Sequence, residues 1–236
     1  MCGRYHQHKP REAMALMFEI GEVLGDPDAF SPRWNIAPTQ LAPVVRTSAE
    51  GRRTLSRLRW GLVPPWAKDT KDAARCINAR AETAPIKPSF RDAVKKRRCL
   101  VPATGWYEWR RDGTRKQAFT FEPAEEAFFA FGGLWSIWRP RAEDGTFGEP
   151  VETFTVLTVD ANASAAAVHD RMPLVLPREA WARWLDPEFT DVDALGGDVR
   201  SCPVEWIRLR PLSDKVNNVR HEGPDLLLDV PGAETA

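Results

Sequence analysis

The stretch CLVPATGWYEWRRDGTRKQAFTFE, residues 99–122, places strand candidates on either side of a turn signal. The runs Cys99–Pro102 and Gln117–Glu122 are short and rich in apolar and aromatic side chains, which is typical of strands. Between them, Glu108 stands among aromatic residues in a further strand candidate, and Asp112-Gly113 is typical of a hairpin turn. The middle of the chain is therefore predicted to form antiparallel sheet.

The flanking sequence predicts more strands and a few short helices. Residues 10–24 have apolar side chains at helical spacing, with Pro10 at the start and Gly25 after the end. Residues 30–43 are rich in proline and asparagine and are interpreted as an ordered loop. The remaining strand candidates are Leu41–Arg46, Thr54–Trp60, Ala127–Leu134 and Thr153–Val159, and the remaining helix candidates are Pro88–Arg98 and Arg178–Leu185.

This mixture predicts an α+β fold: a single compact domain spanning residues 1–236, with an irregular antiparallel sheet or barrel-like core and flanking short helices. The length suits one domain. The tail from about Gly232 is predicted to be disordered.

Composition narrows the class of partner. Lys plus Arg and Asp plus Glu balance at 33 each, so a nucleic-acid partner would need a local basic patch. The sequence has no apolar run of about 18 residues and no signal-peptide core, which predicts a cytoplasmic protein without a membrane partner. Its four cysteines form no CxxC pair, which predicts reduced thiols and no structural zinc. We expect no metal and no cofactor.

Cys2 is followed by Gly3 and Arg4, so removal of Met1 would leave an α-amine and a thiol on adjacent carbons. Their ordinary pKa values, about 8 and about 8.5, make both nucleophiles accessible near neutral pH. The amine can form a Schiff base with a carbonyl, and the sulfur can then close a five-membered thiazolidine ring. A cysteine at position 2 is weak evidence by itself, because some residue must stand there.

Glu108 and His169 are candidates for proton transfer. A carboxyl group among aromatic rings tends to have a raised pKa, which suits a general acid or base. The alternative is that Glu108 points to solvent while Tyr107 and Trp109 point inward, since strands alternate. Histidine as a residue type can shuttle a proton near physiological pH, which makes His169 a candidate, although a lone histidine is more often structural.

Arg4, Arg80 and Arg171 each stand beside a candidate catalytic residue, and guanidinium groups bind phosphates in a forked geometry. Ion pairing with local acids is the alternative for these arginines. The basic run at residues 95–98 is interpreted as a solvated helix end or as an extension of a basic groove.

Taken together, the segments MCGR, WNIAPTQ, WGLVPPW, NARAET, RCLVPATGWYEW and HDRMPLVL resemble the SRAP family, the SOS response-associated peptidases or abasic-site processing proteins. The likeness runs from about Cys2 to about Val230. It implies that the chain senses an abasic site in single-stranded DNA, whose open-chain sugar carries an aldehyde. It also implies a covalent thiazolidine crosslink to Cys2 that shields the lesion, with possible autopeptidase and lyase-type activity.

The resemblance also implies roles for individual residues. Cys2 is the nucleophile, and Asn78 orients the terminal region. Glu108 serves proton transfers in formation and resolution of the Schiff base, and His169 assists opening of the sugar ring and protonation of the departing hydroxyl. The residues implied to contact DNA are Arg4, Arg80 and Arg171 on phosphates and Pro38 and Trp106 against bases. The protein is expected to act as a monomer that associates with the nucleoid when it is bound to DNA.

Two other functions remain open from the sequence. Glutamine amidotransferase-like amidohydrolases also begin Met-Cys-Gly and use the freed amine to activate the thiol. A noncovalent reader of modified DNA is the second alternative, in which Cys2 plays no part.

Overall fold

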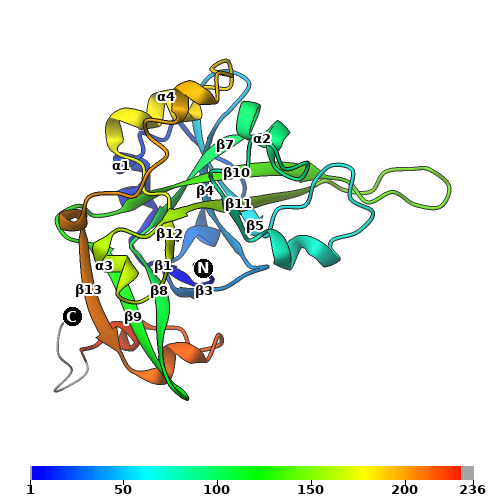
Figure 1. Ribbon diagram of the computed structural model, residues 1–236. Coiled ribbons are helices and arrows are strands. Elements are labelled where there is room, and N and C mark those ends of the chain that lie inside the picture. The colour runs from blue at the N-terminus through cyan, green and yellow to red at the C-terminus, as the bar shows by residue number, and fades with distance from the viewer. Residues whose placement is uncertain (1, 230–236) are drawn as a thin grey trace.

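Strands from distant parts of the sequence close into a barrel-like core (Figure 1). In this computed structural model, which describes residues 2–229, β5, β4, β7, β10 and β11 are neighbours in that order. The barrel closes where β11 pairs in parallel with β5, at Thr153↔Arg59 and Phe154↔Trp60. The prediction of an α+β fold with a barrel-like core is confirmed, and the parallel pairs make its larger sheet mixed.

The strands have the following bounds: β1 Tyr5–Gln7, β2 Glu22–Val23, β3 Arg33–Ile36, β4 Leu41–Thr47, β5 Arg53–Trp60, β6 Asn78–Arg80, β7 Arg98–Ala103, β8 Gly105–Asp112, β9 Arg115–Pro123, β10 Phe129–Trp138, β11 Val151–Asp160, β12 Arg171–Pro173 and β13 Ile207–Leu212. The helices are α1 Arg11–Met17, α2 Arg91–Lys96, α3 Ala163–Ala166 and α4 Trp181–Leu185. Short 3-10 helices lie at Pro27–Phe30, Lys71–Cys76, Arg178–Ala180, Asp193–Leu195, Val204–Trp206, Asp214–Asn217 and Pro224–Leu227.

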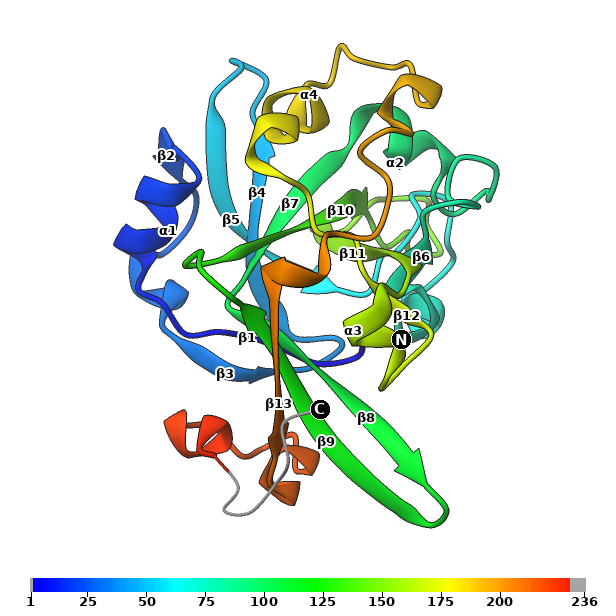
Figure 2. The same cartoon turned by 60° about the vertical axis from the view of Figure 1, so that its left-hand side comes forward.

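A second sheet, in the order β13-β9-β8-β1-β3, carries the N-terminal strand. Its β8–β9 hairpin turns at Gly113 and Thr114, one residue after the predicted Asp112-Gly113, and projects away from the barrel (Figure 2). The chain passes from β7 through Thr104 directly into β8. At this junction Gly105 has no room for a side chain, because a Cβ atom would lie 2.5 Å from the Phe121 carbonyl oxygen. Because Gly105 has no side chain, β8 can lie close to its neighbours β1 and β9.

Aromatic side chains fill the space between the two sheets. Tyr5 packs edge-on against Trp60 at 5.2 Å between ring centroids, and Trp106 stacks on Phe121 at 4.6 Å. All four are fully buried. The core therefore joins β1, β5, β8 and β9, which are the strands nearest the N-terminus and Glu108.

Two sequence predictions need correction. The helix predicted for residues 10–24 ends at Met17, because Glu19 takes a left-handed conformation with φ 54° and Arg53 hydrogen-bonds the Phe18 carbonyl. The chain then adds β2 alongside β5. Residues 30–43 are not only a loop, since β3 pairs with β1 and β4 begins at Leu41. The predicted removal of Met1 and the predicted disorder of the tail lie outside the described residues.

Candidate functional site

Cys2 and Asn78 meet where the second sheet approaches the barrel. Cys2 precedes β1 and is fully buried, and Asn78 begins β6, which pairs in parallel with β11. The Asn78 Nδ2 donates a hydrogen bond of 2.7 Å to the Cys2 carbonyl oxygen. Asn78 is itself buried, so the bond is shielded from water and fixes the backbone of the nucleophile candidate.

Glu108 lies on β8 and is buried, with 5% of its surface exposed. Its strand is covered on both faces, since Tyr107 is buried as well, so the alternative of a solvent-facing carboxylate is wrong. Burial raises the pKa of Glu108, against the opposing effect of the positive chain terminus and of His169. Desolvation outweighs the nearby positive charges, and the carboxyl holds its proton to a higher pH than an exposed glutamate does.

The Cys2 thiol responds to the same surroundings. Burial raises its pKa well above the ordinary range of a cysteine, and the negative charge of Glu108 raises it further. The thiol therefore keeps its proton at neutral pH while it is enclosed. The mutual influence also places the two groups within electrostatic reach of each other.

His169 follows α3 and precedes β12. Asn162 caps α3 by accepting a hydrogen bond from the Ala165 backbone N–H at 3.0 Å, which fixes the turn before the histidine. The His169 Nδ1 accepts from the Arg171 backbone N–H at 3.0 Å and lies 2.8 Å from the Asp170 carboxylate. Because His169 lowers the pKa of Glu108, the two side chains belong to one electrostatic cluster.

The structure thus brings together the four residues that the resemblance implied as catalytic. A hydrogen bond joins Cys2 to Asn78, and electrostatic interactions join Cys2 to Glu108 and Glu108 to His169.

The three arginines occupy different environments. Arg80 ends β6, two residues after Asn78, and its side chain is exposed. Arg4 is half-buried, and its Nη1 donates to the Asn35 Oδ1 at 2.7 Å and to the Val216 carbonyl at 3.0 Å. Arg80 is therefore the arginine best exposed for a phosphate, whereas Arg4 also secures the strand that follows Cys2.

Arg171 corrects the prediction of an open phosphate contact. Its side chain is 8% exposed and pairs with Glu82 at 2.8 Å and with Asp160 at 2.5 Å. The hydrogen bond from Arg171 lowers the pKa of Glu82, so this partner is ionised. A phosphate would have to displace two carboxylates, and the local ion pairing considered as the alternative is what the structure shows.

Trp106 corrects a second prediction, because it is fully buried and stacks on Phe121. A base cannot stack on it in this arrangement. Pro38 is half-buried at a tight turn next to Thr39, which has φ 70°, and its surface remains open to contact.

Two further residues in this region were not predicted from the sequence. Asn35 accepts from Arg4 and donates to the carbonyls of Asn218 and His221, which ties the N-terminal region to the C-terminal segment. Asn35 stands within the segment WNIAPTQ, and that position was the sequence signal that could have identified it. Trp66, within WGLVPPW, has an exposed fraction of 65% and offers the aromatic surface that Trp106 lacks.

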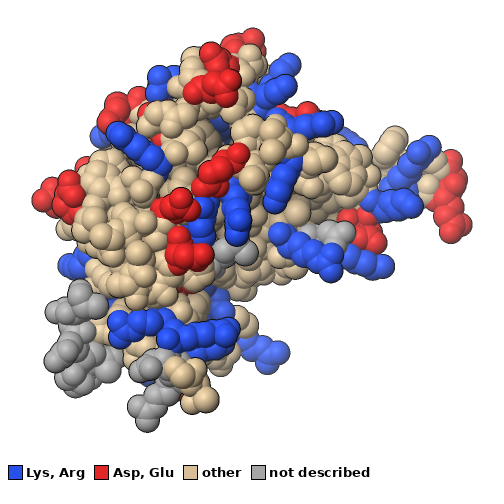
Figure 3. Space-filling view, in the orientation of Figure 1, with Lys and Arg blue, Asp and Glu red and all other residues tan. Residues whose placement is uncertain are grey.

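Positive side chains gather around this part of the molecule (Figure 3). In the orientation of Figure 1, Lys and Arg lie on several sides of the N-terminal end and form a band over the β8–β9 hairpin. The hairpin contributes exposed Arg110, Arg111 and Lys116. The local basic surface that a neutral chain needs for nucleic acid is therefore present.

Among residues 2–229, no three His, Cys, Asp or Glu side chains are grouped closely enough to hold a metal ion. Within the same residues, every helix is too short or too polar to span a bilayer.

The sequence and the fold are those of a known family. Residues 1–219 match the profile of the SOS response associated peptidase family, SRAP, and the chain belongs to this family. It is 35% identical over 228 residues to the abasic site processing protein YoqW of Bacillus subtilis, covering 96% of this chain and 99% of that protein. It is 30% identical over 268 residues to the abasic site processing protein HMCES of Mus musculus, covering 96% of this chain and 75% of that protein.

Solved structures show the same fold. A Bacteroides thetaiotaomicron protein superposes with a TM-score of 0.83 at 24% identity, covering 97% of this chain and all of that one. A Bordetella bronchiseptica protein superposes with a TM-score of 0.72 at 25% identity, covering 90% of this chain and all of that one.

Proposed function

We propose that this chain, once Met1 is removed, processes abasic sites in single-stranded DNA by trapping them covalently on Cys2. The observation that carries the proposal is the Cys2 backbone held by Asn78 at 2.7 Å beside a glutamate whose pKa is raised. Membership of the SRAP family and the names of the relatives support the same lesion as substrate.

The proposed chemistry proceeds in two steps. The α-amine adds to the C1′ aldehyde, and loss of one water leaves a Schiff base. The Cys2 sulfur then bonds to the carbon of the protonated Schiff base, which closes the thiazolidine ring, and the thiol proton passes to the carboxylate that gave up its proton when water left. No oxidant or cofactor is needed, because the only leaving group is water. Fixing amine, thiol and aldehyde in one site replaces a bimolecular encounter with an intramolecular one.

We assign the proton transfers to Glu108 and His169. A protonated Glu108 donates to the departing hydroxyl of the carbinolamine, which its raised pKa favours near neutral pH. His169 assists opening of the sugar ring. Asn78 keeps the Cys2 carbonyl in place throughout, and the same cluster is a candidate for removing Met1 and for lyase-type reversal of the crosslink.

For the DNA strand we propose a path over the basic surface around Cys2. Arg80 is the proposed phosphate contact nearest Asn78, and Arg4 adds positive charge while it supports the strand. Pro38 is retained as a proposed base contact. Since one copy of the chain supplies the whole cluster, we propose that it works as a monomer in the cytoplasm, at the nucleoid.

The test uses the protein without Met1 and an oligonucleotide with one abasic site. We expect a product that survives denaturing electrophoresis, with the summed mass of both partners minus one water. Cys2→Ala should abolish it, whereas Cys76→Ala, a change at a partly buried cysteine, should not. An adduct that persists in Cys2→Ala, or that forms with a borohydride-reduced lesion lacking the aldehyde, would contradict the proposal.

The same preparation separates the alternatives. Ammonia release from glutamine would support an amidohydrolase. A noncovalent reader would give salt-sensitive DNA binding without any denaturant-resistant product, in wild type and in Cys2→Ala alike. Within the proposed mechanism, Glu108→Gln and His169→Ala should slow adduct formation while DNA binding persists. Unchanged rates would remove these residues from the mechanism.

A further inference from the structure

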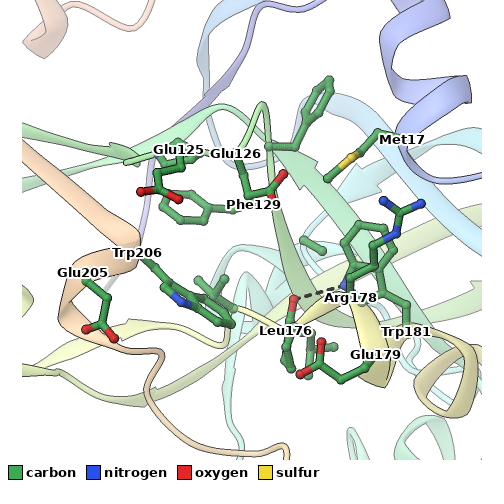
Figure 4. Close-up of a pocket in the computed structure, with 15 residues that line it drawn as sticks. Met17, Glu125, Glu126, Phe129, Leu176, Arg178, Glu179, Trp181, Glu205 and Trp206 are labelled. Atoms are coloured by element: carbon green, nitrogen blue, oxygen red, sulfur yellow. Dashed lines mark hydrogen bonds between the residues drawn. The ribbon is translucent and has the colours of Figure 1, made fainter.

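A cavity of about 360 Å³ lies apart from the Cys2 cluster (Figure 4). It is enclosed by the end of α1, the β9–β10 connection, the turn that leads into α4 and the 3-10 turn before β13. None of Cys2, Asn78, Glu108 or His169 lines it. The cavity is therefore a separate site that the proposed DNA chemistry does not use.

The inner surface of this pocket is apolar and aromatic. Phe129 and Trp181 are buried in its walls, whereas Trp206 is 36% exposed and lies across the pocket from Trp181 in Figure 4. The Trp181 Nε1 donates to the Leu176 carbonyl at 3.0 Å, which fixes that wall. A pocket of this size, with a preformed aromatic wall, suits one or two side chains of a ligand.

The rim of the pocket is acidic. Glu125, Glu126, Glu179 and Glu205 are all exposed lining residues. The single basic lining residue, Arg178, lies 3.1 Å from Glu19 outside the pocket, and Glu19 also pairs with Arg53; the four glutamates therefore outnumber the one positive charge of the rim. Carboxylates above aromatic rings attract a guanidinium or ammonium group, through charge and through cation–π contact.

The same charges exclude the DNA strand, because phosphates would meet four carboxylates. They also exclude this chain's own tail, since residues 230–236, VPGAETA, contain no lysine or arginine. Apolar surface continues beside the pocket, where Leu16 is 83% and Val204 is 43% exposed. The occupant thus needs a positive charge next to apolar side chains. It also needs to be longer than one small molecule, because the apolar surface continues beyond the pocket.

We propose that this pocket docks a partner protein through an exposed segment that carries arginine or lysine beside an aliphatic or aromatic residue. The basic group lies between the rim glutamates and over Trp206, and the apolar neighbour enters toward Phe129. Such a site would bring a second protein to the lesion while the Cys2 cluster stays free for DNA.

The test starts from a displayed library of random twelve-residue peptides, selected on the full-length protein. We expect enriched peptides with Arg or Lys next to Leu, Phe or Trp. Their affinity, measured by fluorescence anisotropy, should fall about tenfold or more in the double variant Glu125→Lys/Glu205→Lys. It should also weaken as salt rises, because charge attraction is screened.

The matched control is Glu143→Lys/Glu149→Lys, the same charge change at exposed residues of another loop. It should bind the peptides like wild type, and both double variants should melt and capture abasic DNA like wild type. Enrichment of acidic or uncharged peptides, or binding unaffected by the pocket variant, would overturn the proposal. Competition by agmatine at the same affinity as the peptide would identify a small-cation site instead, and a dimer that depends on the pocket would identify a second copy as the occupant.

Discussion

Arg98 is predicted to be one of the main determinants of stability, because its buried guanidinium caps two helices at once. Its Nε donates to the Trp184 carbonyl at 2.6 Å, and its Nη1 donates to the carbonyls of Val94 and Lys95 at 2.7 Å. Its Nη2 donates to the carbonyls of Asp186 and Phe189. All of its N–H donors are thus used, and the residue is 4% exposed. The bonds close the C-terminal ends of α2 and α4, whose last carbonyls have no partner within the helix.

The size of the effect follows from these contacts. Arg98→Met keeps the apolar stem and removes every donor, and each hydrogen bond from a charged group is worth about 1.5–3 kcal/mol. The full sum overstates the loss, since burying the guanidinium itself costs several kcal/mol and carbonyls near the surface regain water. We expect a net loss of about 3 kcal/mol, or a melting temperature lower by about 6–12 °C for a chain of this size. Arg98→Lys keeps the positive charge but not the planar, forked set of N–H donors, and should lower the free energy of unfolding by about 2 kcal/mol.

The assay is urea unfolding followed by circular dichroism, with calorimetry for the melting temperature. Arg111→Met, on the exposed face of the β8–β9 hairpin, is the matched control and should change the free energy of unfolding by less than about 0.5 kcal/mol. The reasoning is refuted if Arg98→Met stays within about 1 kcal/mol of wild type. It is also refuted if Arg98→Lys equals wild type, because the planar fork would then be unnecessary.

Three further predictions concern the site and its support. The melting temperature of Glu108→Gln should rise relative to that of wild type as pH increases from about 4 to about 8. The reason is that the pKa of Glu108 is raised, so its ionisation destabilises the folded wild type, whereas glutamine does not ionise. A difference in melting temperature that shrinks with pH would contradict this. Gly105→Ala should cost about 2 kcal/mol or more in urea unfolding because its Cβ meets backbone, whereas Gly197→Ala, with nothing within 4 Å, should be near neutral. With Met1 retained, iodoacetamide should label buried Cys2 more slowly than partly exposed Cys76, as followed by peptide mass mapping.

The predicted strands of the barrel were confirmed because their signals are local. Residues 54–60 and 153–159 alternate or cluster apolar side chains within one segment, and β5 and β11 include them. The structure of residues 18–36 depends on partners far away in the sequence. There β2 exists because it pairs with β5, and β3 exists because it pairs with β1, so propensity favoured a longer helix and a loop.

The same distinction applies to the site. The motifs of the family identified Cys2, Asn78, Glu108 and His169, and the structure places them together. Predictions about exposure were less successful, because exposure depends on what covers a strand. Trp106 is buried by Phe121 of the neighbouring strand, and Arg171 is neutralised by Glu82 from a distant loop. The basic run at residues 95–98 likewise ends in the buried Arg98, whose partners come mainly from α4 and the segment after it.

The burial of Cys2 and Glu108 is compatible with nucleophilic chemistry because of how protons balance in the proposed reaction. The reaction consumes no net proton: one proton leaves Glu108 with the departing water, and the thiol proton replaces it as the carbon–sulfur bond forms. A thiol that holds its proton, beside a carboxyl that also holds its own, can therefore enter the reaction without prior ionisation to solvent. Glu108 can donate its proton during loss of water and then accept the thiol proton. The raised pKa values that would hinder an ordinary thiolate nucleophile thus suit this reaction, in which an acid is needed before a base.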